Sequence, residues 1–368
     1  MVIDTSSAAP LLRAALVGTG SVAHLHAQSL ATISGVELVA VADVMPGRAA
    51  EFAAEYGIAA AHTSVEDLLA AGHIDVVHLC TPPGVHGPQA AAAFAHGAHV
   101  IAEKPPALSL AELQQMSDAA TAAGKEFAVV FQQRTGTAAA HIRELLRSGA
   151  LGRPLLATCN TLWYRGTDYF AVPWRGKWDT EGGGTTLSHG IHQIDLLAFL
   201  LGDWNQASAQ LWRQARDVET EDVSTGTILF DSGVVASVVT SVLSPRESSA
   251  IRIDTEKATI ELEHLYGHNR VHWRITPAAH IGAEEVAGWE FPDDIAPSGH
   301  NALLESVYDS LLSGTALPEV ATNPARALEI VTAFYASART GQIVDRLSVQ
   351  SDPALRGSLA APVTDNRE

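Results

Sequence analysis

The sequence predicts an α/β protein built as a doubly wound parallel sheet, followed by an α+β domain with a large, mostly antiparallel open sheet. Two observations lead to this prediction. In the first third of the chain, short apolar runs such as 14–17, 37–43 and 74–80 alternate with helical runs, which is typical of a parallel sheet with helices on both faces. From Pro154 onward, β-like runs follow one another across short turns such as 231–233, as in antiparallel hairpins.

The chain length supports two domains. With 368 residues and about 100–200 residues in a usual domain, we place the first domain at residues 1–135 and the second at 136–350. The second domain should contain a helix near 186–201 that ends at Gly202. Residues 351–368 are polar and interrupted by Pro and Gly, so they are expected to form a loose tail.

Composition excludes several classes of function. The chain has 23 Lys and Arg against 41 Asp and Glu, a formal net charge of −18, and no cluster of basic residues. Nucleic acid and anionic membrane surfaces are therefore not expected partners. We find no secretory signal in residues 1–10 and no apolar stretch long enough for a membrane span. The two cysteines, Cys80 and Cys159, are predicted to be buried thiols in a cytoplasmic protein, although one disulfide is possible.

A glycine motif follows the first predicted strand and precedes a helix, which is the context of a dinucleotide-binding Rossmann fold. The first glycine permits a tight turn, the second lets the backbone approach a pyrophosphate, and the alanine allows close packing of helix and strand. The helix N-terminus then offers free N–H groups to the phosphates. We therefore predict that the motif binds the cofactor through Gly18, Thr19, Gly20, Ser21, Val22 and Ala23.

An acidic residue decides between the two nicotinamide cofactors. Asp43 ends the second strand, where a carboxylate binds the ribose hydroxyls of NAD and repels the phosphate of NADP. NAD is therefore the predicted cofactor and NADP the less favoured one, although Arg48 lies close enough in sequence to weaken the choice. The alternative is a glycine turn that binds no ligand.

Two loops follow later strands, at the edge of the sheet where ligands bind in open α/β folds. Thr81, Pro82 and His86 are predicted to border the cofactor, although prolines can also simply end a strand. Glu103 and Lys104 end the fifth strand and are also predicted to bind the cofactor. A lysine there can donate or accept a proton if burial and a cationic nicotinamide lower its pKa. A solvated surface lysine is the alternative.

A second group of polar residues follows the glycines at 182–184. Ser188, His192 and Asp195 share one side of the predicted helix because they are spaced by four and three residues. We expect Asp195 to orient the His192 ring and His192 to move a proton; a buried, purely structural histidine is the alternative. His189 and His192 lack a third ligand at suitable spacing, so no metal site is predicted.

These motifs together resemble the glucose–fructose oxidoreductase, inositol dehydrogenase and rhizopine-catabolism (Gfo/Idh/MocA) family over nearly the whole chain. The resemblance rests on GTGSVA at 18–23, Asp43, TPPGVH at 81–86, HVIAEKPPA at 99–107 and the glycine–histidine run at 182–195. It implies a Rossmann domain, an α+β domain with an open sheet, and oxidation or reduction of a sugar or cyclitol carbon with NAD(P). It also implies that Lys104 and His192 are catalytic.

The sequence departs from the resemblance at one position. Many family members carry Asp four residues before the catalytic histidine, where this chain has Ser188. A serine alone is no acid or base at neutral pH, so more of the proton transfer is expected from His192 and Lys104, with Ser188 bonding the substrate or a water.

Aromatic and long polar side chains before the glycine run suit a sugar, whose faces are apolar and whose rim carries hydroxyls. The tryptophans can alternatively be core or interface anchors. The predicted substrate-binding residues are Lys104, Trp163, Arg165, Tyr169, Trp174, Arg175, Ser188, His189 and His192.

The sequence thus predicts an NAD-dependent sugar or polyol oxidoreductase. A non-catalytic dinucleotide-binding regulator and an NAD-dependent glycosidase are the alternatives. The second sheet needs cover on both of its faces, for which runs such as 234–242 are apolar, so a homodimer or homotetramer is expected.

Overall fold

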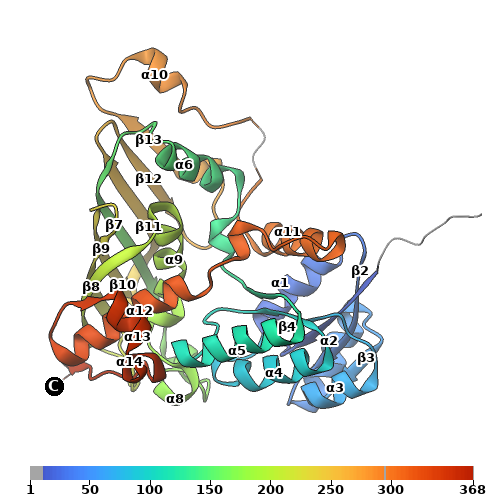
Figure 1. The fold of residues 1–368 in the computed structure, drawn as a ribbon. Helices are drawn as coiled ribbons and strands as arrows, with labels where there is room; N and C mark the ends of the chain where they lie inside the picture. Colours follow the sequence, from blue (N-terminus) through green and yellow to red (C-terminus); the bar gives the residue numbers. More distant parts are fainter. Residues whose placement is uncertain (1–10, 294–295, 368) are drawn as a thin grey trace, which may run out of the picture.

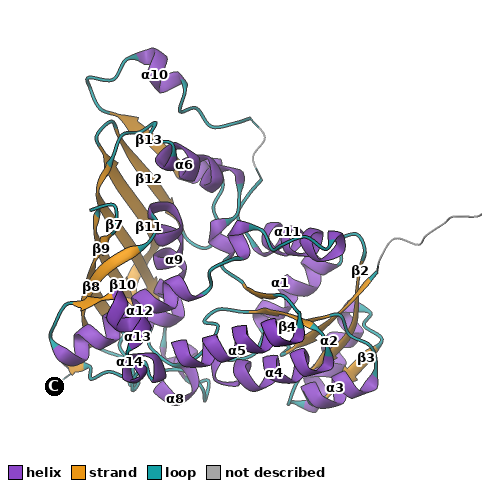
Figure 2. Ribbon diagram, in the orientation of Figure 1, coloured by secondary structure: helices purple, strands orange, loops and turns teal. Residues whose placement is uncertain are grey.

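The computed structural model describes residues 11–293 and 296–367, and the expectation of no secretory signal in residues 1–10 lies outside them. Within these residues the chain forms two sheets that stand side by side, each with helices packed against it (Figures 1 and 2). None of the helices in the described part of the chain is long and apolar enough to cross a membrane.

The first sheet is parallel, as predicted. Its order, β3-β2-β1-β4-β5-β6, is that of a dinucleotide-binding Rossmann fold. The strands are β1 (Leu12–Val17), β2 (Val36–Ala42), β3 (Ala60–His62), β4 (Val76–Leu79), β5 (His99–Ala102) and β6 (Phe127–Val129). The helices between them are α1 (Ser21–Leu30), α2 (Pro46–Tyr56), α3 (Val65–Ala71), α4 (His86–His96) and α5 (Leu110–Ala123).

Local sequence explains the ends of these helices. Ser64 and Ser109 cap α3 and α5 by accepting hydrogen bonds from the amides of Asp67 and Glu112. Gly57 and Gly97 end α2 and α4 in the left-handed conformation, with φ of 67° and 88°, which a glycine adopts without strain. Each of these helices therefore ends a few residues before the next strand begins.

The second sheet is mixed but mostly antiparallel, as predicted, with the order β13-β12-β11-β7-β10-β9-β8-β14 and β15 added beside β8. Its strands are β7 (Pro154–Tyr164), β8 (Trp204–Arg213), β9 (Val223–Phe230), β10 (Val235–Ser241), β11 (Leu243–Thr255), β12 (Ala258–His264), β13 (Trp273–Pro277), β14 (Val344–Asp345) and β15 (Thr364–Asp365). The helices of this half are α6 (Thr137–Arg147), α7 (Thr167–Phe170), α8 (Trp178–Glu181), α9 (Ile191–Leu201), α10 (Ala283–Ala287), α11 (His300–Ser313), α12 (Ala325–Thr340), α13 (Arg346–Ser351) and α14 (Pro353–Gly357).

The two faces of this sheet differ. Helices α9 and α12 pack on one face (Figure 1). The opposite face carries the exposed side chains of alternate residues, among them Leu156 and Val235, which are 46% and 44% exposed. Ser and Thr residues lie between such apolar side chains, so this open face is only partly apolar.

Helix α11 belongs to the second half of the sequence but packs against α1 of the first (Figure 1). Its buried residues Leu304 and Tyr308 join the same apolar cluster as Leu16 and Ala27. The domain limits at 135 and 350 remain predictions, and they do not account for this return of the chain.

Two local predictions are wrong. Residues 353–367 are not a loose tail: α14 begins at Pro353, β15 pairs with β8, and Arg213 forms an ion pair with Asp365. The helix expected over 186–201 is not regular, because Thr186–Gly190 forms a π-helical turn before α9 begins at Ile191. Such turns often occur at functional sites.

Candidate active site

The glycine motif has the geometry that a dinucleotide requires. Gly18 has φ of 91°, and a Cβ atom there would lie 2.8 Å from the carbonyl oxygen of Cys80, so only glycine fits. A Cβ at Gly20 would meet no described atom within 4 Å, which leaves open space beside the backbone. Ser21 and Val22 begin α1 without a side-chain cap among the described residues. The open cradle and the uncapped helix end together fit a pyrophosphate.

Asp43 is held against the same loop. Its Oδ2 accepts hydrogen bonds from the amide and hydroxyl of Thr19 at 2.9 and 2.6 Å, and its Oδ1 accepts one from the amide of Met45. Burial acts to raise the pKa of Asp43, but these hydrogen bonds and nearby Arg48 hold it below the ordinary value. The group is therefore an anion beside the glycine loop, as the cofactor prediction requires.

The loop after β4 only partly fits the prediction. The hydroxyl of Thr81 donates to Gln89, and Pro82 precedes a short 3₁₀ turn. His86 is fully buried, with its ring nitrogens 2.9 and 3.1 Å from the backbone oxygens of Thr81 and Pro106. The His86 side chain therefore joins this loop to the one after β5, and its predicted contact with the cofactor stays a prediction.

Lys104 extends from the end of β5 to the other domain. Its Nζ donates to the backbone oxygen of Ser188 at 3.4 Å. Burial is the main cause that lowers the pKa of Lys104, and the guanidinium groups of Arg165 and Arg175 lower it further. The carboxylates of Glu103 and Glu181 act in the opposite direction. A lysine with a lowered pKa is suited to proton transfer.

His192 lies on the first turn of α9, and its side chain is largely buried, with 7% exposed. Burial and the nearby Lys104 hold the pKa of His192 well below 6.5, so the ring is neutral at neutral pH. Its Nδ1 has no hydrogen-bond partner among the described residues. The ring is thus left free to interact with a ligand.

Asp195 does not hold this ring, so that prediction is wrong. The two carboxylate oxygens of Asp195 bind Arg134 instead, with Nε donating to Oδ2 at 2.7 Å. Arg134 follows β6 and also donates to the backbone oxygen of Thr322 at 2.6 Å. Both side chains are almost completely buried, and the pair joins α9 to the first domain.

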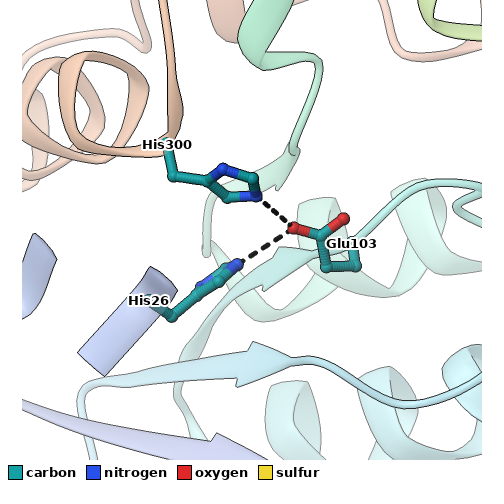
Figure 3. A group of neighbouring side chains, drawn as sticks. All are labelled: His26, Glu103 and His300. Atoms are coloured by element: carbon teal, nitrogen blue, oxygen red, sulfur yellow. Dashed lines mark hydrogen bonds and ion pairs between the residues drawn. The ribbon is translucent and has the colours of Figure 1, made fainter. Parts of the chain in front are cut away.

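The side chain of Glu103 points toward His26 of α1 and His300 of α11 (Figure 3). Its Oε1 accepts hydrogen bonds from Nε2 of His26 at 3.1 Å and Nε2 of His300 at 2.9 Å. Burial would raise the pKa of Glu103, but these two histidines hold it well below 4.5. Oε1 is thus engaged by His26 and His300, and Oε2 accepts from the amide of Lys104 at 3.2 Å. The predicted contact of Glu103 with the cofactor stays a prediction.

The same network continues into the core. Nδ1 of His26 lies 2.8 Å from Nδ1 of His78, and Nε2 of His78 lies 2.7 Å from the hydroxyl of Tyr308. With Glu103 ionised, one arrangement of protons satisfies every contact: Tyr308 donates to His78, His78 to His26, and His26 to Glu103. Two histidines and a carboxylate also form a zinc-like donor set, but hydrogen bonding already accounts for all three groups.

The predicted substrate residues largely come together. The guanidinium groups of Arg165 and Arg175 lie over the ring of Tyr169, 5.5 and 3.8 Å from its centre. The Tyr169 hydroxyl is 3.1 Å from Nε2 of His189. Burial raises the pKa of Tyr169 to about 12, so this hydroxyl keeps its proton.

Trp163 and Trp174 complete this wall. Trp163 packs edge-on against His189 and lies under Arg165, and Trp174 lies under Arg175. Trp163 is only 6% exposed and donates from Nε1 to Ser249. It therefore serves in part as a core anchor, as the alternative interpretation held.

An interdomain pocket of about 510 Å³ opens beside His192. Its lining combines Leu25 and Gln28 from α1, Gln132 and Gln133 after β6, and Trp163, Tyr266 and His300 from elsewhere. A larger hollow of about 720 Å³ lies between β8, β9 and residues near the C-terminus. No titratable side chain lines that hollow, so it offers no acid–base chemistry.

Sequence comparison shows where the chain belongs. The description "Oxidoreductase family, NAD-binding Rossmann fold" matches residues 12–131, and "GFO/IDH/MocA C-terminal domain" matches residues 139–261. D-glucoside 3-dehydrogenase of Escherichia coli is 32% identical over 281 residues, which are 70% of this chain and 79% of that protein. The chain belongs to the Gfo/Idh/MocA family.

Two further proteins are similar to this chain over much of their length. The scyllo-inositol 2-dehydrogenase of Bacillus subtilis is 30% identical over 64% of this chain and 68% of its own. The crystal structure of the WlbA dehydrogenase from Bordetella pertussis, in complex with NADH and UDP-GlcNAcA, has a TM-score of 0.81 at 28% identity and covers 91% of this chain and 98% of its own. The chain thus has the NAD-binding Rossmann domain of the family.

Several residues around the site were not predicted. Glu181, directly before the glycines, accepts a hydrogen bond from Ser188 at 2.8 Å. Glu247 and the Tyr266 hydroxyl lie 2.8 and 3.1 Å from Arg165. Arg134 and His300 come from segments with no recognisable motif. Only Glu181 carried a signal in the sequence, its position beside the glycine run.

Proposed function

We propose that this chain is an NAD-dependent oxidoreductase that acts on a CH–OH carbon of a sugar, cyclitol or related polyol. One observation carries the proposal: Lys104 of the cofactor domain reaches the backbone of Ser188, one turn before His192, across the gap between the domains. Two groups suited to proton transfer therefore lie near each other at the cofactor edge of the first sheet.

Each part of the proposed reaction has a corresponding group in the protein. NAD, when bound, would accept or supply the hydride. Gly18 to Ala23 would hold its pyrophosphate and Asp43 its adenosine ribose, which favours NAD over NADP. Lys104 would take the proton of the substrate hydroxyl during oxidation or return it during reduction, and His192 would hydrogen-bond the same oxygen or share the transfer. Such positioned groups contribute about 10²–10⁴ in rate.

Unpartnered polar atoms support a ligand with several hydroxyl groups. Within the described part of the chain, Nδ1 of His192 and the side-chain oxygens of Gln132 and Gln133 are buried without a hydrogen bond. All three atoms can accept a hydrogen bond. All three residues line the interdomain pocket, so hydroxyl donors of a polyol would satisfy them.

A substrate panel tests the proposal. Purified protein is incubated with NAD or NADP and a set of hexoses, uronic acids, glycosides and inositols, and the appearance of reduced cofactor is followed by absorbance. We expect turnover with at least one polyol and a preference for NAD. Tight NAD binding without turnover on the whole panel would favour the regulator, and glycoside cleavage without net NADH would favour the glycosidase.

We also propose that the chain forms a homodimer or homotetramer through the open face of the second sheet. Exposed Leu156 and Val235 on neighbouring strands support this assignment. Light scattering at micromolar concentration should give a multiple of the chain mass, and Val235→Lys should lower it because a charge at a packed interface is costly. A monomeric parent protein would contradict the proposal.

A further inference from the structure

Glu181 is a buried carboxylate that the proposed mechanism does not use. It ends α8, and its side chain is only 4% exposed. The Oε2 atom accepts a hydrogen bond from the amide of Gly176 at 2.6 Å, and Oε1 accepts one from the hydroxyl of Ser188 at 2.8 Å. Arg175 lies 3.7 Å from Oε1. The carboxylate is therefore fixed from three directions, next to the predicted site.

Residue 188 stands between Glu181 and the lysine. Its backbone oxygen accepts from Nζ of Lys104, and its hydroxyl donates to Glu181. A serine hydroxyl has one proton and two acceptor lone pairs. Because the proton is used by Glu181, the Ser188 oxygen is left as an acceptor, and a hydroxyl group of a ligand is the donor that would match it.

We propose that Glu181 is a positioning residue for the proton transfer: it fixes the Ser188 hydroxyl as an acceptor for a substrate hydroxyl and places a negative charge beside Lys104. This inference rests on the proposed function and deepens it. Ser188 then does not need to be an acid or a base, because the ionisable group is the carboxylate behind it.

The charges around Lys104 make the effect measurable. Burial and Arg165 and Arg175 lower the pKa of Lys104, whereas Glu103 and Glu181 raise it. His189 and His192 also face this lysine, and both are neutral because burial holds their pKa well below 6.5. Burial raises the pKa of Glu181 itself, whereas the Gly176 amide, the Ser188 hydroxyl and the charges of Arg175 and Lys104 act in the opposite direction. Removing the charge of Glu181 should lower the pKa of Lys104 further, while removing the Ser188 hydroxyl should leave it largely unchanged.

The first test is Glu181→Gln, which keeps the shape of the side chain. The pH profile of kcat/KM is measured for the most active substrate of the panel. In the direction of oxidation Lys104 must lose its proton, so the rate rises with pH through its pKa. We expect Glu181→Gln to move the rising part of the pH profile, here called the pH limb, to lower pH by about one unit. It should also lower kcat, because the amide can donate to Ser188 and turn its hydroxyl proton toward the substrate.

A carboxylate of similar type serves as the control. Glu112 is half-buried and accepts from the amide of Leu108 at 2.8 Å, but it lies outside the cleft. Glu112→Gln should leave the pH limb in place. NADH binding, followed by its fluorescence, checks that each variant is folded. An unshifted limb in folded Glu181→Gln would overturn the inference.

A reciprocal exchange gives the sharper test. Ser188→Asp alone sets a second carboxylate against Glu181, and the two like charges should lower activity at least tenfold. The double variant Glu181→Gln with Ser188→Asp moves the charge across one hydrogen bond, so its activity should exceed that of either single variant. Losses that simply multiply in the double variant would contradict the inference.

The remaining outcomes are also decisive. If Glu181→Gln does not fold, Ser188→Ala still tests the claim: its kcat should fall about tenfold with the pH limb retained, and parental turnover in it would refute the role of Ser188. Parental protein without turnover on any substrate refutes the proposed function and this inference with it. An active parent with an unchanged Glu181→Gln profile refutes the inference alone.

Discussion

The two sides of the interdomain cleft, here called the cofactor wall and the opposite wall, differ in the chemical groups that they present. The cofactor wall, which belongs to the first domain, presents backbone amides, glycines and the carboxylate of Asp43. These groups lie within one continuous segment, residues 18–43. The opposite wall presents charged and aromatic side chains, such as the partly buried Arg175 and the buried Glu181. A backbone cradle provides affinity for a common ligand, whereas buried charges adjust proton affinities. Changes in the first wall should therefore alter cofactor binding, and changes in the second should alter turnover.

Replacing the two proposed proton-transfer groups should give the largest effect. Lys104→Ala and His192→Ala should each lower kcat by about 10²–10⁴, because positioned proton transfer is lost. The dissociation constant of NADH should change little, since neither side chain belongs to the glycine loop. Steady-state kinetics and NADH fluorescence measure the two quantities. Parental turnover in both variants would remove the assignment.

The pH dependence follows from the same residues. The pKa of Lys104 lies below its ordinary value near 10.5 because of burial, so oxidation should become faster as pH rises and level off below that pH. The rising limb should be absent from the residual activity of Lys104→Ala. A limb that persists in this variant would assign it to another group.

The pair Arg134–Asp195 tests whether the walls are held together. Asp195→Asn leaves the guanidinium of Arg134 buried without its counter-ion and should cost about 3–5 kcal/mol of stability. Denaturant unfolding measures this change. By contrast, Asp254→Asn on the sheet surface, which removes the ion-pair partner of the exposed Arg252, should cost below about 1 kcal/mol. Equal effects of the two substitutions would contradict the conclusion that the pair Arg134–Asp195 holds α9 against the first domain.

Asp43→Ala should have a smaller effect, confined to the cofactor wall. Loss of a charged hydrogen-bond acceptor should weaken NAD binding about tenfold and narrow the difference from NADP, because the repulsion of its phosphate is removed. Titration with both reduced cofactors measures this difference. A parent protein that prefers NADP would show that our interpretation of Asp43 is wrong.

The smallest effect is expected from metal removal. If hydrogen bonds alone satisfy the Glu103 cluster, dialysis against EDTA should leave both the melting temperature and turnover unchanged. Elemental analysis of the dialysed and undialysed protein checks that no ion was retained. If dialysis lowered the melting temperature and added zinc raised it again, His26, Glu103 and His300 would instead be identified as a metal site.

The sequence predicts the residues of the cofactor wall better than those of the opposite wall. The glycine loop, Asp43 and Lys104 could be found because each lies within a short motif at the end of a strand. Asp195 was misassigned because its partner, Arg134, is 61 residues away and no pattern marks it. The π-helical turn at Thr186–Gly190 also changes the direction of side chains that regular helical spacing would place together. Long-range pairing and irregular backbone are thus what the sequence alone did not provide.

The packing of α11 on α1 has a consequence for how the chain is made. Synthesis proceeds from the N-terminus, and early domains generally fold first. Here the first sheet lacks part of its apolar cover until Leu303, Leu304, Val307 and Tyr308 have left the ribosome. A nascent chain that stops near residue 135 would therefore carry an open apolar surface beside α1. The cofactor half should reach its final stability only late in translation, after most of the other half has been synthesised.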